Sequence, residues 1–404
     1  MSPHSPLRNS HIRQLWTGLL LSAFGDEIYK IALVWTVVSV VSTSAGWFSA
    51  AQAGSVLLFS LFGGVLADRW NHRRTMIAMD LLRAVLVVLP PVLATFLNLS
   101  IWVLLPVAAL VSGLKAFFDP ALQAYLPMLA EQKQILQRTN GLFDSTRRLA
   151  RIVGPSLAAP LQLLVQPLQF FTINAMTFVV SALMIACLPQ CHTEAMAASE
   201  SVFQRVVYGV RALRGQAIMQ YLLLGHGIVN GAWQLGLVLS TALIIQSQHE
   251  GSVALYGLIM SSYGIGNVVA NIWVSRLCIG NPIVPVVGGR LIASAGFIAL
   301  GLAPTPALMM AAAAFAAVGA PLSNIPFLNL LQQRFSRADI ARVYRLRMVS
   351  EGGFILIAMA ISPSLFKLMA PDMVVVGSGL TIGLVGTYGW LRFGVGKSRL
   401  EFEK

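Results

Sequence analysis

Long apolar runs, separated by short polar connections, make up most of the chain. The alternation of apolar and polar residues that marks a half-buried strand is weak in these runs. A helix of about 20 mostly apolar residues crosses the hydrocarbon core of a bilayer. The pattern predicts twelve such helices, over residues 13–41, 45–67, 74–97, 101–129, 140–165, 168–188, 215–246, 252–277, 283–303, 306–332, 341–369 and 373–393. We therefore expect an all-α membrane protein rather than a transmembrane barrel.

The composition strengthens that expectation. Of the 404 residues, 56% are hydrophobic and 11% are charged, whereas a soluble domain carries about 25% charged residues. So little charge cannot wet the surface of a globular protein of this length, and the lipid bilayer is the expected surrounding. The first apolar run is too long for a cleaved signal peptide, so we interpret it as a retained first span.

The net charge of +13 would suggest nucleic-acid binding in a soluble protein. The basic residues instead recur in every second connection: Arg8, Arg13, Arg69, Arg73, Arg74, Lys133, Arg138, Arg205, Arg211, Arg214, Arg276, Arg334, Arg337, Lys397, Arg399 and Lys404. The connections between them hold almost none, with Lys367 the nearest. Loops rich in Lys and Arg lie on the cytoplasmic side. We therefore expect cytoplasmic termini and no nucleic-acid partner.

The longest and most polar connection falls at the midpoint of the chain. It predicts an N-terminal six-helix bundle over 1–188, a cytoplasmic linker over 189–214 and a C-terminal six-helix bundle over 215–404. The halves echo each other weakly, with GPSL at 154–157 and SPSL at 362–365. Duplication of a six-helix unit is typical of transporters that bind substrate between their halves.

A charged connection, GGVLADRWNHRRTM at 63–76, follows the second apolar run. It resembles motif A of the major facilitator superfamily, and the matching positions are Gly64, Asp68, Arg69, Arg73 and Arg74. The family has a glycine where this chain has Asn71, which also tolerates a left-handed turn. The resemblance implies two pseudo-symmetric six-helix bundles, with Asp68 clamped by arginines and a helix N-terminus as a cytoplasmic latch. The other interpretation is a solvated basic loop.

Small residues in GLFDSTRRLARIVGPSLAA, 141–159, resemble the family's motif C. Gly141, Gly154 and Pro155 match it, and alanines replace the other glycines. Such spacing lets the fifth helix pack closely against a neighbour, and the proline bends it. Motif C is associated with exporters and antiporters; the plainer interpretation is an ordinary packing seam.

Most of residues 20–157 further resembles one branch of the superfamily, the bacterial exporters related to the enterobactin exporter and the macrolide efflux proteins. The segments that carry this are LSAFGDEIYKIAL, ADRWNHRRTMIAMDLLRA, FFDPALQAYLPML and RTNGLFDSTRRLARIVGPSL. The resemblance implies a multi-pass protein of the bacterial cytoplasmic (inner) membrane. Lysophospholipid transporters share part of the first segment.

Ionisable residues inside spans are costly and mark candidate functional positions. Asp26 and Lys30 are one turn apart and can neutralise each other, unless Glu27 competes for Lys30. A carboxylate only half neutralised by a lysine is a candidate proton carrier, so Asp26 or Glu27 either couples protons or forms a structural pair or substrate contact.

Other charges inside the spans fall into two sets. The first half holds residues that we interpret as an inter-helix network near the cytoplasmic ends: Asp80, Arg83, Lys115, Asp119, Asp144, Arg147, Arg148 and Arg151. For Asp80, Arg83 and Asp144 we favour a structural or gating role over the alternative, a substrate contact. In the second half, Arg290 and Glu351 either meet each other or meet an ionic substrate. His226 either titrates near neutral pH or is a packed, hydrogen-bonded histidine.

The leading hypothesis is a secondary active exporter, a proton antiporter for an amphipathic small molecule such as a siderophore or hydrophobic drug. Its expected partners are that substrate, protons and lipid; we expect a monomer without cofactor or metal. No GxxxxGK[ST] loop for ATP is present. The alternative is a lysophospholipid flippase of the same fold. An intramembrane enzyme is disfavoured because HExxH and GxSxG are absent.

Overall fold

The computed structural model describes residues 6–67, 71–130, 132–190, 211, 213–248, 252–276, 282–335 and 337–394. Through residue 190 these form the helices η1 (Pro6–Arg8), α1 (Ser10–Val41), η2 (Ser42–Ser44), α2 (Ala45–Ala67), α3 (His72–Leu93), α4 (Ile101–Leu129), α5 (Lys133–Ser156), α6 (Ala158–Gln162) and α7 (Gln169–Ala186). The later residues form α9 (Ala217–Trp233), η3 (Gln234–Ser240), α10 (Thr241–Gln248), α11 (Val253–Val274), α12 (Ile283–Gly301), α13 (Pro306–Ala317), α14 (Gly319–Arg334), α15 (Arg337–Leu368) and α16 (Pro371–Phe393).

Each of the twelve predicted helices corresponds to one of these helices or to a short series of them. Ten segments of the described chain are long and apolar enough to cross a membrane. The smaller number arises partly because α1 and α2 join into one segment, Ser10–Phe59. It also arises because α5, rich in arginine, is not among the ten. The all-α fold and the membrane-spanning helices are confirmed.

One helix begins well before its predicted start. The pattern predicts the fifth helix at 140–165, but α5 begins at Lys133, and its first two turns are mostly polar. An apolar run marks only the part of a helix that lipid covers. A polar extension of the same helix is therefore not predicted from the apolar run. Next to the proline that was expected to bend this helix, α5 ends at Ser156, directly after Pro155, and α6 begins at Ala158.

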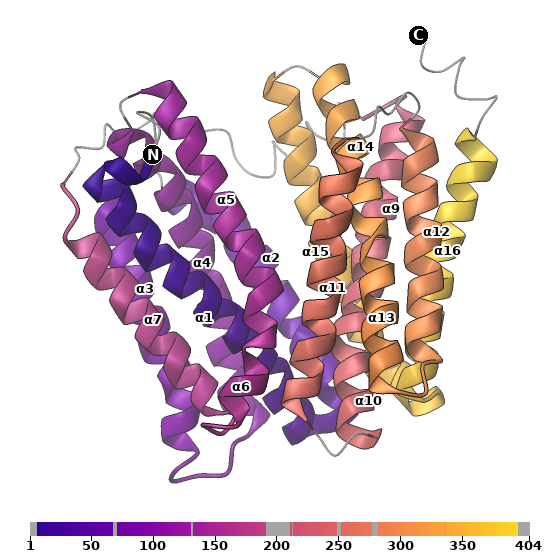
Figure 1. The fold of residues 1–404 in the computed structure, drawn as a ribbon, viewed down its shortest axis with the longest axis horizontal. Helices are drawn as coiled ribbons and strands as arrows, with labels where there is room; N and C mark the ends of the chain where they lie inside the picture. Colours follow the sequence, from indigo (N-terminus) through magenta and orange to yellow (C-terminus); the bar gives the residue numbers. More distant parts are fainter. Residues whose placement is uncertain are drawn as a thin grey trace. The chain divides into compact units, whose positions relative to one another are not determined.

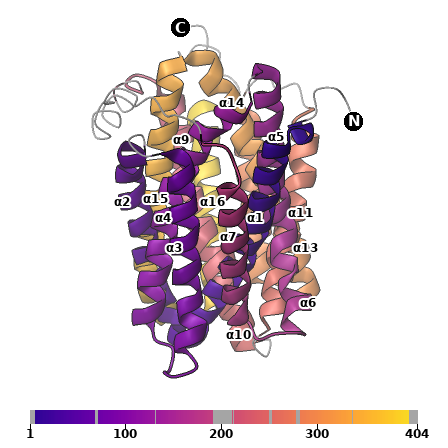
Figure 2. The same ribbon diagram turned by 90° about the vertical axis from the view of Figure 1, so that its left-hand side faces the viewer.

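The contacts divide the chain into two compact units, one of residues 1–41 and 54–199 and the other of residues 42–53 and 200–404. Most of the predicted linker over 189–214 lies outside the described residues, so the domain boundaries stay a prediction. Figure 1 shows both units as bundles of helices, and Figure 2 shows α1, α3, α4 and α7 of the first unit running alongside one another.

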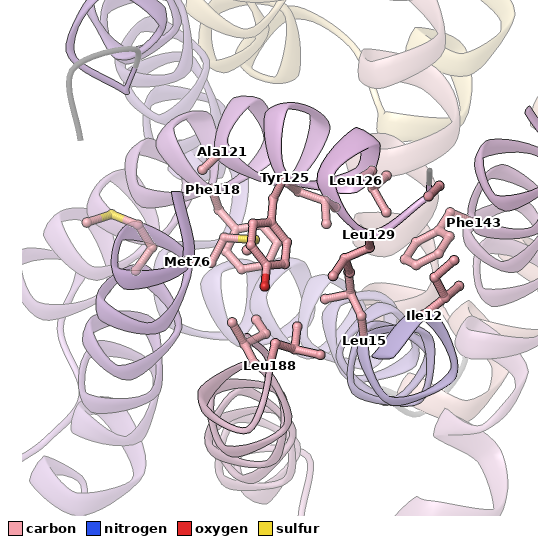
Figure 3. Packing of buried hydrophobic residues seen from close by; sticks show 14 residues of the cluster. Ile12, Leu15, Met76, Phe118, Ala121, Tyr125, Leu126, Leu129, Phe143 and Leu188 are labelled. Carbon is pink, nitrogen blue, oxygen red and sulfur yellow. The ribbon is translucent and has the colours of Figure 1, made fainter. Parts of the chain in front are cut away.

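Close helix packing in the first unit depends on small residues of α1. A Cβ added to Gly18 would lie 3.2 Å from the Met184 Cβ of α7, and one added to Gly25 would lie 2.5 Å from the Asn174 amide oxygen. At one end of this unit, Ile12, Phe118, Tyr125 and other apolar residues form a buried cluster (Figure 3). The Tyr125 hydroxyl donates to the Pro189 carbonyl at 2.6 Å, which ties α4 to the residues directly after α7.

The second unit packs α12 against α16 and α9 against α15. Its backbones approach closely where glycines face each other: a Cβ on Gly289 would lie 2.6 Å from the Gly319 carbonyl oxygen. Between α9 and α10 the span turns π-helical over Gln234–Ser240. Within this wider turn the Ser240 hydroxyl donates to the Leu235 carbonyl at 2.8 Å.

Candidate functional site

A charged cavity of about 140 Å³ lies within the first unit, between α1, α3, α4 and α5. Charged side chains from all four helices line it: Asp26, Glu27, Lys30, Arg83, Lys115, Asp119, Arg147 and Arg151. These positions are far apart in the sequence, and the fold gathers them because α1 packs against α4 and α5 while α3 packs against α4. The structure thus places most of the charges predicted inside the first-half spans around one cavity.

The ion pairs of α1 differ from the expected ones. Lys30 pairs with Glu27, with 2.6 Å between Nζ and Oε1, so the alternative pairing is the observed one. Asp26 instead accepts from the Lys115 Nζ of α4 at 2.5 Å. The prediction of an Asp26–Lys30 pair is therefore wrong. It was based on spacing along one helix, which does not show that a neighbouring helix supplies another cation.

Gly154 brings α5 against α1 beside these pairs. A Cβ added there would lie 2.5 Å from the Cβ of Glu27. Gly141, the other matching glycine of the motif C resemblance, has nothing of the described structure within 4 Å of an added Cβ. Of these two glycines, only Gly154 therefore takes part in close packing. The contact at Gly154 sets the distance between the arginines of α5 and the carboxylates of α1.

Asp80 and Arg83 form a different kind of pair, in which Arg83 lines the cavity and Asp80 lies behind it. Both side chains are buried, at 0% and 3% exposed, and they are bonded to each other within α3. The guanidinium also lies between two aromatic rings, 4.7 Å from the Phe118 centroid and 4.4 Å from that of Phe178. This enclosure holds Arg83 in place, and a structural or gating role for the two residues stays a prediction.

The remaining charges of the predicted network lie on or near α5 and are more exposed. Asp119 accepts from Arg147 at 3.2 Å, and Asp144 accepts from Arg148 at 2.8 Å. Exposed pairs of this kind contribute only about 0–1 kcal/mol, so their partners can exchange. Arg151 takes part in no ion pair among the described residues.

Aromatic and aliphatic residues complete the cavity wall, namely Trp16, Leu19, Phe118 and Phe143. The Trp16 indole N–H donates to the Thr146 hydroxyl at 2.9 Å, which links α1 to α5. Phe118 and Phe143 belong to the buried cluster of Figure 3, so the cavity lies next to the apolar core of the unit. Charges and apolar surface together suit a ligand that is itself amphipathic.

The second unit has a polar network around His226. Its Nε2 lies 3.4 Å from the Glu351 carboxylate and 2.7 Å from an Arg347 nitrogen. Because a guanidinium only donates, Nε2 is the acceptor in that bond. Arg347 also donates to the Asn324 amide oxygen at 2.8 Å. His226 is thus a hydrogen-bonded histidine between α9 and α15.

Sequence reasoning missed Arg347 as part of this network. It lies near the polar start of the predicted eleventh helix, in RVYRLRM, and was not distinguished from the flanking loop arginines. Its burial, with 9% of the residue exposed, is the signal that sets it apart. The structure gives Arg290, expected beside Glu351 or a substrate, another neighbour: its guanidinium lies 4.6 Å from the Tyr221 ring centroid. It also faces Gly225, where an added Cβ would lie 2.7 Å from it.

Part of the motif A resemblance can be placed. Asp68 and Arg69 lie outside the described residues, and Gly64 lies in the last turns of α2. Arg73 bonds to the carbonyls of Ile185 and Ala186, the first at 3.2 Å, so it caps the C-terminus of α7. Asn71 has φ of −65° rather than a left-handed turn, and its side chain caps α3 by accepting from the Arg74 N–H.

A family model described as transmembrane secretion effector, of the major facilitator superfamily, matches residues 1–385. The chain is 25% identical over 217 residues to macrolide efflux protein A of Streptococcus pyogenes, covering 52% of this chain and 53% of that protein. It is 32% identical over 145 residues to the multidrug efflux pump Tap of Mycolicibacterium fortuitum, covering 34% of this chain and 35% of that protein. The chain thus spans about half the length, or less, of these curated relatives.

Solved transporter structures share the fold. A bacterial homologue of the human lysosomal transporter Spinster, inward-facing and occupied, matches with a TM-score of 0.72 at 14% identity, covering 98% of this chain and 97% of that chain. The nucleoside transporter NupG matches with a TM-score of 0.71 at 11% identity, covering 95% and 99%. At such identities the likeness establishes the fold alone.

Proposed function

The chain belongs to the transmembrane secretion effector family of major facilitator transporters, and from this membership we propose that it exports an amphipathic small molecule. A siderophore or a hydrophobic drug is the expected substrate class. The efflux proteins among its relatives support export, although each alignment covers only part of the chain. The protein is a multi-pass membrane transporter and not an enzyme.

The charged cavity of the first unit is the observation that carries this proposal. It combines exchangeable ion pairs with an aromatic wall. Transport by alternating access requires a site that binds well enough to select a substrate and loosely enough to release it. Pairs that are partly exposed meet this condition, because a substrate can replace one partner at little cost.

The proposed energy source is a proton gradient, used by proton antiport. Asp26 and Glu27 lie on adjacent positions of α1, and each is paired with a lysine that is about half exposed. A proton on either carboxylate removes the charge that holds its lysine. The same proton removes the negative charge that a hydrogen-bond donor of the substrate would contact, so proton and substrate would compete for one carboxylate, as antiport requires.

The remaining assignments rest on the sequence. We place the protein in the bacterial cytoplasmic membrane as a monomer, with both termini in the cytoplasm. The bundles 1–188 and 215–404 would move about the substrate, and Asp68 would latch them on the cytoplasmic side.

One observation favours the alternative, a lysophospholipid flippase. An apolar groove of about 410 Å³ lies between α9 and α15 of the second unit, lined by leucines together with Phe354 and Ile357. An acyl chain is the kind of ligand that such a surface fits.

Purified protein in vesicles with an imposed pH gradient tests both functions. Siderophores, macrolides and lysophospholipids are compared as substrates. We expect Asp26→Asn or Glu27→Gln to reduce gradient-driven transport at least tenfold while transport down a substrate gradient persists, because only coupling depends on the proton.

Asp372→Asn is the matched control, because this carboxylate lies at the start of α16 and does not line the cavity. Its transport should equal that of the unaltered protein. Equal gradient-driven transport by all three variants would show that the carboxylates of α1 do not couple protons. Transport of lysophospholipids alone would establish the flippase instead.

A further inference from the structure

The charges that line the cavity of the first unit do not balance. Three acids face it, Asp26, Glu27 and Asp119, together with five cations. Each acid is matched by one cation: Lys115, Lys30 and Arg147 respectively. Arg83 is neutralised by Asp80, behind the wall. One cation, Arg151, is left over among the described residues.

Arg151 is also well placed to bind. It lies one turn before Gly154, where α5 packs against Glu27. Arg147 is four residues earlier on α5, so the two guanidinium groups share one face of the helix. The Arg147–Asp119 pair is long, at 3.2 Å, and both its side chains are about 40% exposed, so Arg147 can join Arg151 without breaking a buried contact.

Arg151 is exposed rather than enclosed, so its guanidinium is open to a ligand. A membrane bundle tolerates an arginine best where another group supplies the countercharge. Guanidinium binds carboxylate, sulfonate and phosphate groups through two parallel hydrogen bonds. Trp16 of α1 and Phe143, one turn before Arg147 on α5, add apolar surface to the same cavity. The arrangement matches a molecule with an acidic group at one end and an aromatic or aliphatic body.

We propose that this cavity selects amphipathic molecules that carry an acidic group, which Arg151 binds. The inference rests on the proposed export function and narrows its substrate class. The cavity volume of about 140 Å³ takes the acidic end of the molecule rather than the whole of it. A positively charged amphipath is disfavoured, because it would add to the surplus positive charge.

The test uses two fluorescent probes with the same aromatic skeleton. 1-Anilinonaphthalene-8-sulfonate carries an acidic group, and N-phenyl-1-naphthylamine lacks it. Binding to the full chain in nanodiscs of zwitterionic lipid is measured by calorimetry, with empty nanodiscs subtracted. We expect the sulfonate to bind about tenfold more tightly, the effect of a charge-assisted hydrogen bond.

Arg151→Gln should weaken sulfonate binding about tenfold and change binding of the neutral probe less than twofold. Arg148→Gln is the matched control on the same helix, because its guanidinium pairs with Asp144 and does not line the cavity. It should leave the ratio of the two affinities unchanged, which also excludes a general effect of removing charge from α5.

Equal affinity for the two probes in the unaltered protein would overturn the proposal, as would an equal loss of both in Arg151→Gln. Competition with lysophosphatidylglycerol separates the two sources of acidic group: displacement of the sulfonate identifies a lipid phosphate, and its failure identifies a soluble acid. Binding is read without a pH gradient, so a failure of gradient-driven export would overturn the proposed function and leave this result intact.

Discussion

At the scale of single residues, burial distinguishes charged side chains that stabilise the fold from charged side chains that are accessible to a ligand. Asp80 and Arg83 are enclosed by aromatic rings and by each other. Asp144 and Arg148 form a pair of similar spacing on α5, but their side chains are 62% and 59% exposed. Two pairs of similar chemistry therefore differ greatly in what they contribute to stability.

Asp80→Asn should lower the free energy of unfolding by about 3–5 kcal/mol, because it leaves the Arg83 guanidinium buried without its countercharge. Asp144→Asn should cost less than about 0.5 kcal/mol, as expected for an exposed pair one helical turn apart. Unfolding in detergent, followed by tryptophan fluorescence, measures both. Similar midpoints for the two variants would contradict the structural assignment of Asp80.

At the scale of helices, the sequence predicted positions well and partners poorly. The predicted 101–129 coincides with α4, because an apolar run between polar connections has the length of a membrane span. The Asp26–Lys115 pair was not predictable, because it joins residues 89 positions apart whose proximity depends on how α1 packs against α4. Arg347 was not predicted as part of the His226 network for a related reason, because only the packing of its neighbours shows that it is buried.

The contact between α1 and α5 is tested by one substitution at two glycines. Gly154→Ala should destabilise the protein by about 1–3 kcal/mol, because the added methyl group meets the Glu27 Cβ. Gly141→Ala should instead be neutral or stabilising by up to about 1 kcal/mol, since it enters open space and alanine favours a helix. Thermal unfolding midpoints distinguish them, and shifts of the same sign would refute this packing.

At the scale of the whole molecule, the motif A resemblance makes a prediction about turnover. Asp68→Asn should slow transport at least tenfold and change substrate affinity less than twofold, because a latch acts on the exchange between states rather than on the site. Asp372→Asn again serves as the control. Transport rates in vesicles and equilibrium binding give the two quantities, and a loss confined to affinity would rule out the latch.

The π-helical stretch Gln234–Ser240 has a geometric consequence for the seventh span. An ordinary α-helix turns by about 100° for each residue, so each residue accommodated by a wider turn shifts the direction of every later side chain. Residues 241–245 of α10 are all buried, and their orientation depends on that phase. Deleting a single residue before them would rotate this segment about its own axis and carry polar Thr241 away from the surroundings that now enclose it.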